Sequence, residues 1–129
     1  MTSLPKPPTG LLPSSRARWR QFWESQSARV VDLDSDLPRL VRWIQAADEY
    51  DRAAKVVRTS RLVKGSMGQP VLNPLVAYLI HLDTLISRAE TEFGMTPAAR
   101  QRLKLDPEVP EEEDVVDQLR ARRAARQAG

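Results

Sequence analysis

The sequence contains no cysteine, and its 129 residues include a single histidine, His81. Without thiolates there can be no disulfide scaffold, no cysteine-ligated zinc site and no cysteine nucleophile. One imidazole is too few for the common nitrogen-ligated metal sites, so we expect neither a metal nor another cofactor. No apolar run approaches the ~18 residues required to cross a bilayer, so a membrane partner is not expected.

Charge varies strongly along the chain. The formal net charge is only +3, but basic and acidic residues alternate in blocks. Residues 52–70 carry five basic side chains and no acidic one, whereas residues 105–118 carry seven acidic side chains and no basic one. Residues 119–129 are again basic, with four arginines. Because such blocks concentrate electrostatic potential locally, a small net charge is compatible with a nucleic-acid partner.

Proline and charge divide the chain into three parts. Residues 1–13 contain four of the ten prolines and are predicted to form a flexible arm. Residues 14–104 are predicted to form a helical domain. Residues 105–129 combine an acidic linker, which contains Pro107 and Pro110, with a basic tail of helix-forming composition.

Two long amphipathic helices are predicted for the centre of the chain. The first begins near Asp34–Asp36, with Pro38 in its first turn, and ends near Thr59 or Ser60. The second begins at Asn73-Pro74 and ends at Gly94. Apolar residues recur every three or four positions in both helices. These seams consist of Leu40, Trp43, Ala47, Tyr50, Ala54 and Val57 in the first helix and of Leu75, Leu79, Leu82, Ile86, Ala89 and Phe93 in the second.

Matching seams and a short connector predict that the two helices fold back on each other. In the connector, Leu62-Val63 and Val71-Leu72 flank a turn at Gly65–Gly68, which predicts a short β-hairpin or turn at the tip. Shorter helices are expected at residues 14–28, where Trp19 and Trp23 form an anchoring face, and at residues 96–104. The fold class is therefore all-α, a long antiparallel helical hairpin flanked by shorter helices. Apolar residues outside the seams need cover either from the shorter helices or from a neighbouring copy, and we favour self-association.

The chemistry of the chain lies in its basic residues. The acidic residues Asp48, Glu49 and Asp51 are predicted to be solvated on an amphipathic helix, so no catalytic pair is expected and the chain is not predicted to be an enzyme. Five basic residues approach the predicted hairpin tip, and phosphate is their natural counter-ion. These residues are Arg52, Lys55, Arg58, Arg61 and Lys64.

Three short motifs in the middle of the chain resemble the small terminase subunit of tailed bacteriophages. They are Gly65-Ser66-Met67-Gly68-Gln69, Asn73-Pro74-Leu75 and Phe93-Gly94-Met95-Thr96-Pro97-Ala98-Ala99-Arg100, and the resemblance extends over about residues 16–105. It implies a non-enzymatic subunit in the cytoplasm of the infected bacterial host. Such a subunit forms a ring of roughly eight to ten copies. It binds double-stranded viral DNA at the packaging initiation site and delivers that DNA to the large terminase subunit, an ATPase and nuclease.

On this interpretation, residues 14–104 carry both oligomerisation and DNA binding. We assign DNA contact first to the five basic residues near the tip and second to Arg100, Arg102 and Lys104. The oligomer contact is assigned to Leu40, Trp43, Leu79, Leu82 and Ile86, some of which also serve the seam within the chain. The tail at 108–126 is the candidate for docking the large subunit. The alternatives are a helical DNA-binding regulator or nucleoid-associated protein, and an interaction scaffold.

Overall fold

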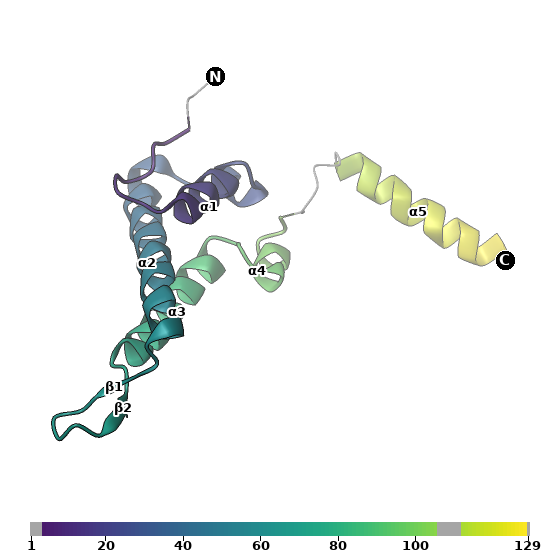
Figure 1. Ribbon diagram of the computed structural model, residues 1–129. Helices are drawn as coiled ribbons and strands as arrows, with labels where there is room; N and C mark the ends of the chain where they lie inside the picture. Colours follow the sequence, from purple (N-terminus) through teal and green to yellow (C-terminus); the bar gives the residue numbers. More distant parts are fainter. Residues whose placement is uncertain (1–3, 106–111, 129) are drawn as a thin grey trace.

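The computed structural model describes residues 4–105 and 112–128, and most of them are helical (Figure 1). In chain order the elements are α1 (Pro13–Trp23), the 3₁₀ helix η1 (Gln26–Val30), α2 (Leu33–Thr59), β1 (Leu62–Lys64), β2 (Pro70–Leu72), α3 (Leu75–Glu92), α4 (Pro97–Arg102) and α5 (Glu112–Ala128). The helices α2 and α3 pack on each other as an antiparallel pair, and the two strands lie at its tip. The predicted helical hairpin is confirmed. The predicted acidic linker falls largely on residues 106–111, outside the described residues.

Helix α2 begins earlier than predicted. Asp32 is its N-cap, because its side chain accepts a hydrogen bond from the N–H of Asp34 at 3.1 Å. The helix therefore starts at Leu33, and Pro38 lies inside it rather than in its first turn. Proline at this position removes one N–H donor from the helix, while acidic residues in the first turn stabilise the positive end of the helix dipole. The predicted end is confirmed, since Thr59 is the last helical residue.

The connector between α2 and α3 folds into a two-stranded antiparallel ribbon, as predicted. In its register Leu62 pairs with Leu72 and Lys64 with Pro70. Gly68 has a φ of +81°, a left-handed conformation that glycine adopts without the steric cost of a side chain. The ribbon continues the α2–α3 pair and lies at the end far from α1 (Figure 1).

Asn73 and Gly94 define the two ends of α3, as the sequence predicts. The Oδ1 atom of Asn73 accepts a hydrogen bond from the N–H of Leu75 at 3.0 Å, and its side-chain amide donates to the carbonyl of Ser60 at 2.8 Å. Asn73 therefore caps α3 and ties its start to the end of α2. At the other end Gly94 has a φ of +70°, and its carbonyl accepts a hydrogen bond from the buried Ser27 hydroxyl at 2.7 Å.

The hydrophobic core lies where α1 crosses α2 and the end of α3. Phe22 is central to an aromatic cluster, with its ring centroid 5.9 Å from that of Trp43 and 6.3 Å from that of Phe93. Leu40 and Ile44 are fully buried beside this cluster. The predicted seam omitted Ile44, which packs into the core because α1 covers a wider part of α2 than α3 alone would reach.

The N-terminal residues 4–12 lie against this core, whereas composition predicted a flexible arm. The side chain of Leu11 is buried in the core cluster. The indole N–H of Trp19, itself buried on α1, donates a hydrogen bond to the carbonyl of Pro5 at 2.8 Å. Helix α1 ends at Trp23, earlier than predicted, and the 3₁₀ helix η1 occupies the remainder of the expected helix.

Candidate nucleic-acid interface

Four of the five predicted DNA-contact residues near the tip are exposed at the end of α2 and on the first part of the connector. Lys55 and Arg58 lie on the last turns of α2, Arg61 follows the helix, and Lys64 ends β1. All four side chains are exposed, and none is in an ion pair within residues 4–105. We call these four residues the basic tip. They follow one another from the last turns of α2 to the end of β1, and their role in DNA contact stays a prediction.

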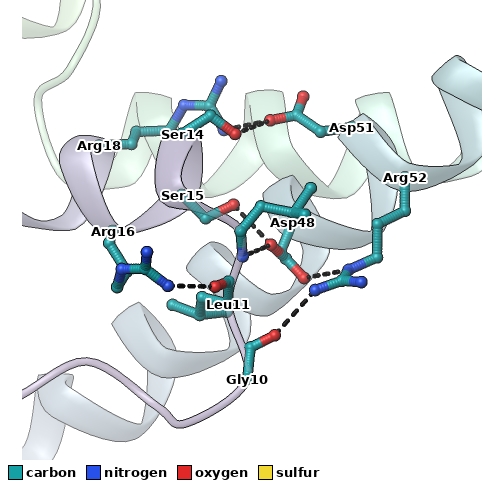
Figure 2. Close-up of polar contacts among 10 residues, drawn as sticks. Gly10, Leu11, Ser14, Ser15, Arg16, Arg18, Asp48, Asp51 and Arg52 are labelled. Carbon is teal, nitrogen blue, oxygen red and sulfur yellow. Dashed lines mark hydrogen bonds and ion pairs between the residues drawn. The ribbon is translucent and has the colours of Figure 1, made fainter.

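Arg52, the fifth predicted residue, has a different environment. Its Nε donates to the Asp48 carboxylate at 2.8 Å, and its Nη2 donates to the carbonyl of Gly10 at 2.8 Å (Figure 2). The charge of Arg52 is therefore balanced inside the chain, and its geometry is fixed by the N-terminal segment. Arg52 contributes less to the field of the surface than the residues of the basic tip do.

Asp48 is the centre of this polar cluster, although the sequence predicted a solvated acid. Only 6% of its surface is exposed. Its Oδ1 accepts hydrogen bonds from the N–H of Leu12 and from the hydroxyl of Ser15, both at 2.8 Å, and its Oδ2 accepts from Arg52 (Figure 2). The one signal in the sequence was the spacing of Asp48 and Arg52, which places an acid and a base one turn apart on a helix.

The pKa of Asp48 is lowered from its ordinary value of 3.8. Burial by itself raises the pKa of a carboxyl group, because it disfavours the charged form. The hydrogen bonds from Arg52, the Leu12 N–H and the Ser15 hydroxyl outweigh burial, because they stabilise the carboxylate, and the charge of Arg52 adds to them. Asp48 is therefore a buried, fully engaged anion that joins the N-terminal segment to α2.

A second, more exposed contact lies one turn further along α2. The Asp51 carboxylate accepts from the hydroxyl of Ser14 at 3.2 Å and from Arg18 at 3.3 Å (Figure 2). The nearby guanidinium of Arg16 donates to the carbonyl of Leu11 at 2.6 Å. Because these groups are largely accessible to water, they add less to stability than the Asp48 cluster does.

The second predicted set of DNA-contact residues lies away from the basic tip. Arg100 is half-buried on α4, and Arg102 donates to the carbonyl of Thr91 at 3.1 Å, whereas Lys104 is exposed just after α4. Helix α4 follows the end of α3 that is far from the ribbon (Figure 1). The 18 residues of α3 separate the two sets by about 27 Å, at 1.5 Å per residue. The structure does not bring the two sets together.

Arg100 also lines a cavity of about 510 Å³ between α1, η1 and the end of α3. Phe22 and Trp43 contribute apolar surface to it, and Glu90 contributes a carboxyl group. Burial raises the pKa of Glu90; the charge of Arg18 opposes this shift and that of Asp83 adds to it. This cavity could not be predicted from the sequence, because its walls come from four separate segments.

Most of the predicted oligomer-contact residues lie in the seam within the chain, and their contact with a second copy stays a prediction. Leu40, Trp43 and Leu82 are buried within the single chain, Ile86 packs against the same core, and Leu79 is half-buried. The seam that the sequence assigned to both roles is used inside the chain, since α1 and α3 cover it. Apolar surface that remains exposed on α3 comes from other residues, namely Tyr78, Ile80 and Leu85.

Within residues 4–105 and 112–128, no group of histidine, cysteine, aspartate or glutamate side chains is suited to hold a metal ion. In the same part of the chain no helix combines the length and the apolar character needed to cross a membrane. The helical hairpin with its basic tip defines a small helical protein with a cationic surface at one end.

The sequence model of the family described as phage terminase, small subunit, matches residues 15–109. This chain belongs to that family, which has a role in packaging the phage genome together with DNA and a large terminase subunit. Comparisons with curated proteins and with solved structures gave no match.

Proposed function

We propose that this chain binds double-stranded viral DNA at the packaging initiation site and delivers it to the large terminase subunit. It has no catalytic role of its own and acts in the cytoplasm of the infected host. Membership of the terminase small-subunit family supports the packaging role. The observation that carries the DNA-binding part is the basic tip, four exposed cations without an ion-pair partner in residues 4–105.

The basic tip suits a polyanion for an electrostatic reason. Each phosphate that a lysine or arginine neutralises releases counter-ions that were condensed on the DNA. This release favours binding, and the affinity falls as the salt concentration rises because releasing ions then gains less free energy. Arg52 is expected to add little to this counter-ion release, because the Asp48 carboxylate already balances its charge. We therefore assign DNA contact to Lys55, Arg58, Arg61 and Lys64, and assign Arg52 to the internal cluster.

The double variant Arg58→Glu/Arg61→Glu tests this assignment. We expect DNA affinity at about 0.1 M salt to fall at least tenfold. The slope of log affinity against log salt should become less steep by about 0.9 for each lost contact. Fluorescence anisotropy of a labelled duplex over a salt series measures both quantities.

A matched control is the double variant Arg39→Glu/Arg42→Glu. Both arginines are exposed on the first half of α2, so the net charge changes equally. Arg39 lies 19 residues before Arg58, about 28 Å along the helix axis. The control should keep most of the wild-type affinity. Equal losses in the two variants would contradict a localised DNA contact at the basic tip.

We also propose that the chain forms a closed ring of roughly eight to ten copies. A single type of head-to-tail interface, repeated by rotation around one axis, is sufficient to close such a ring. Support comes from apolar side chains that α3 leaves exposed, among which Ile80 is 66% and Leu85 42% exposed. A second copy is the natural cover for such side chains, because burying them removes apolar surface from water. The ring would repeat the basic tip around its circumference.

Native mass spectrometry of Ile80→Glu/Leu85→Glu tests the ring. The wild type should appear as one closed multimer, and the variant as monomers and small species, because two charges would have to be buried at the interface. Thr84→Glu, an exposed polar position on the same helix, serves as the control and should keep the wild-type mass. A monomeric wild type would refute the ring, and a wild-type dimer that binds DNA would favour the regulator.

The C-terminal tail is the proposed docking element for the large subunit. Helix α5 extends from Glu112 to Ala128, with acidic residues in its first half and four exposed arginines in its second half. This order complements the helix dipole and gives a partner two surfaces of opposite charge.

A further inference from the structure

The ribbon of β1 and β2 exposes apolar side chains at the tip of the molecule. Leu62 and Leu72 are cross-strand partners and both are exposed, whereas Val63 and Val71 on the opposite face are half-buried. Beyond them Met67 lies in the turn with 89% of its surface exposed, more than any other large apolar side chain in the described residues. A side chain this exposed contributes almost nothing to the packing of its own chain.

The turn that carries Met67 has a defined backbone. The N–H of Gly65 donates to the carbonyl of Gln69 at 2.7 Å, and the N–H of Gly68 donates to the carbonyl of Gly65 at 3.0 Å. The side-chain oxygen of Gln69 accepts from the N–H of Met67 at 2.9 Å. These bonds engage the N–H groups of Gly65, Met67 and Gly68 within the turn, which presents the Met67 thioether to solvent.

Two basic residues lie next to the exposed apolar side chains of the ribbon. Arg61 lies immediately before β1, and Lys64 ends it opposite Pro70. A two-stranded ribbon is narrow enough to enter a groove of DNA, and apolar side chains such as methionine can insert between base pairs from the minor groove. Charge that attracts phosphates and an apolar group that can contact base faces are therefore combined on one projecting element.

Resting on the proposed function, we infer that the ribbon enters the minor groove of the DNA held by the basic tip and that Met67 inserts as an apolar wedge at a base step. Insertion unstacks that step partially and bends the duplex. The energetic cost is lowest at flexible pyrimidine–purine steps such as TA, so the wedge gives the protein a preference for deformable sequence without hydrogen bonds to bases.

The other possible occupant of this surface is a second copy of the chain. Two ribbons that met at their tips would bring Lys64 of each copy, which ends β1 next to the turn, close to Lys64 of the other, and like charges disfavour that contact. A polyanion is attracted by the same charges, and it also offers apolar base faces to Met67. The combination of charge and exposed apolar surface therefore favours DNA.

The test uses the full-length protein and two end-labelled duplexes of about 30 base pairs, one with a central TA step in an A·T context and one with a G·C-rich centre. With the wild type we expect tighter binding to the TA duplex and a shorter end-to-end distance, measured by fluorescence energy transfer. Met67→Ala should bind the TA duplex about tenfold more weakly and leave it nearly straight. The salt dependence should not change, because no charge is removed.

Two control variants separate the wedge from the turn that carries it. Met67→Leu keeps an apolar wedge and should bend DNA as the wild type does, and Ser66→Ala alters the same turn without changing binding. If Met67→Ala binds and bends both duplexes like the wild type, the wedge is overturned while the proposed function stands. A wild type that does not bind DNA overturns both. A change in the native mass of Met67→Ala would assign the ribbon to a contact between copies and overturn the wedge.

Discussion

Replacement of Asp48 by alanine is expected to lower the free energy of unfolding by about 3 kcal/mol. The reason is that three donors depend on one buried carboxylate. Without it the half-buried N–H of Leu12 and the buried hydroxyl of Ser15 lose their acceptor, and Arg52 loses its balancing charge. Arg52 is partly exposed, so water can partly replace the hydrogen bond that its guanidinium loses. Most of the lost stability therefore comes from the Leu12 N–H and the Ser15 hydroxyl.

Urea unfolding at a fixed protein concentration measures this effect, because the proposed ring would make apparent stability depend on concentration. The matched control is Asp51→Ala, which removes the more exposed carboxylate one turn away. That variant should lose less than about 1 kcal/mol, in line with surface ion pairs. Comparable losses in the two variants would contradict a special role for Asp48.

The same cluster predicts a pH dependence. The pKa of Asp48 is lower in the folded chain than its ordinary value of 3.8, so the unfolded chain binds the proton more readily. The stabilisation is therefore fully present above that ordinary value and is lost as the pH falls below it, through the lower folded pKa. Wild-type stability should fall over this acidic range, and Asp48→Ala should show a shallower decrease. Parallel curves for the two proteins would refute this source of acid sensitivity.

Leu40→Ala should cost about 3 to 4 kcal/mol of unfolding free energy, because a fully buried leucine leaves a cavity when it is shortened. Leu40 is 0% exposed and packs in the core with Trp43 and Ile44. Val56→Ala on the same helix is the control, since the Val56 side chain is exposed and its loss should change stability by only about 0.5 kcal/mol. Denaturant unfolding of both variants gives the comparison.

The Leu40 result also separates two interpretations of the helical seam. If Leu40 belonged to the contact between copies, as the sequence suggested, Leu40→Ala would lower the native mass without destabilising the isolated chain. The structure instead predicts an unstable chain, with the mass of any remaining folded protein unchanged. Equal and small effects of Leu40→Ala and Val56→Ala would contradict the core described above.

The elements that were predicted correctly depend on local chemistry. Asn73 caps α3 through its own side chain, and Gly94 ends that helix because glycine adopts a left-handed φ freely. The predicted start of α2 was wrong because the sequence offers capping residues both at Asp32 and at Asp34–Asp36. The helix begins after the earlier one, Asp32, although this places Pro38 inside the helix. Ile44 lies outside the predicted seam because an amphipathic pattern does not state how many neighbours cover a helix.

The candidate site was predictable to the extent that it follows from charge. The residues of the basic tip are close in sequence, and all four are exposed between the last turns of α2 and the end of β1. Asp48 could not be identified as buried, because its partners Leu12 and Ser15 come from a segment 33 or more residues away. For the same reason Arg52 was grouped with the free cations, although its acceptors are Asp48 and Gly10.

The family match begins at residue 15, but the contacts that complete this fold begin earlier. Leu11 fills part of the core, and the backbone of Leu12 occupies one oxygen of Asp48. A protein shortened to the matched residues would therefore have a hole beside its aromatic cluster and an incompletely bonded carboxylate in its interior. The folded unit is therefore longer than the region that identifies the family. The additional part consists of a few residues beside prolines, before residue 15.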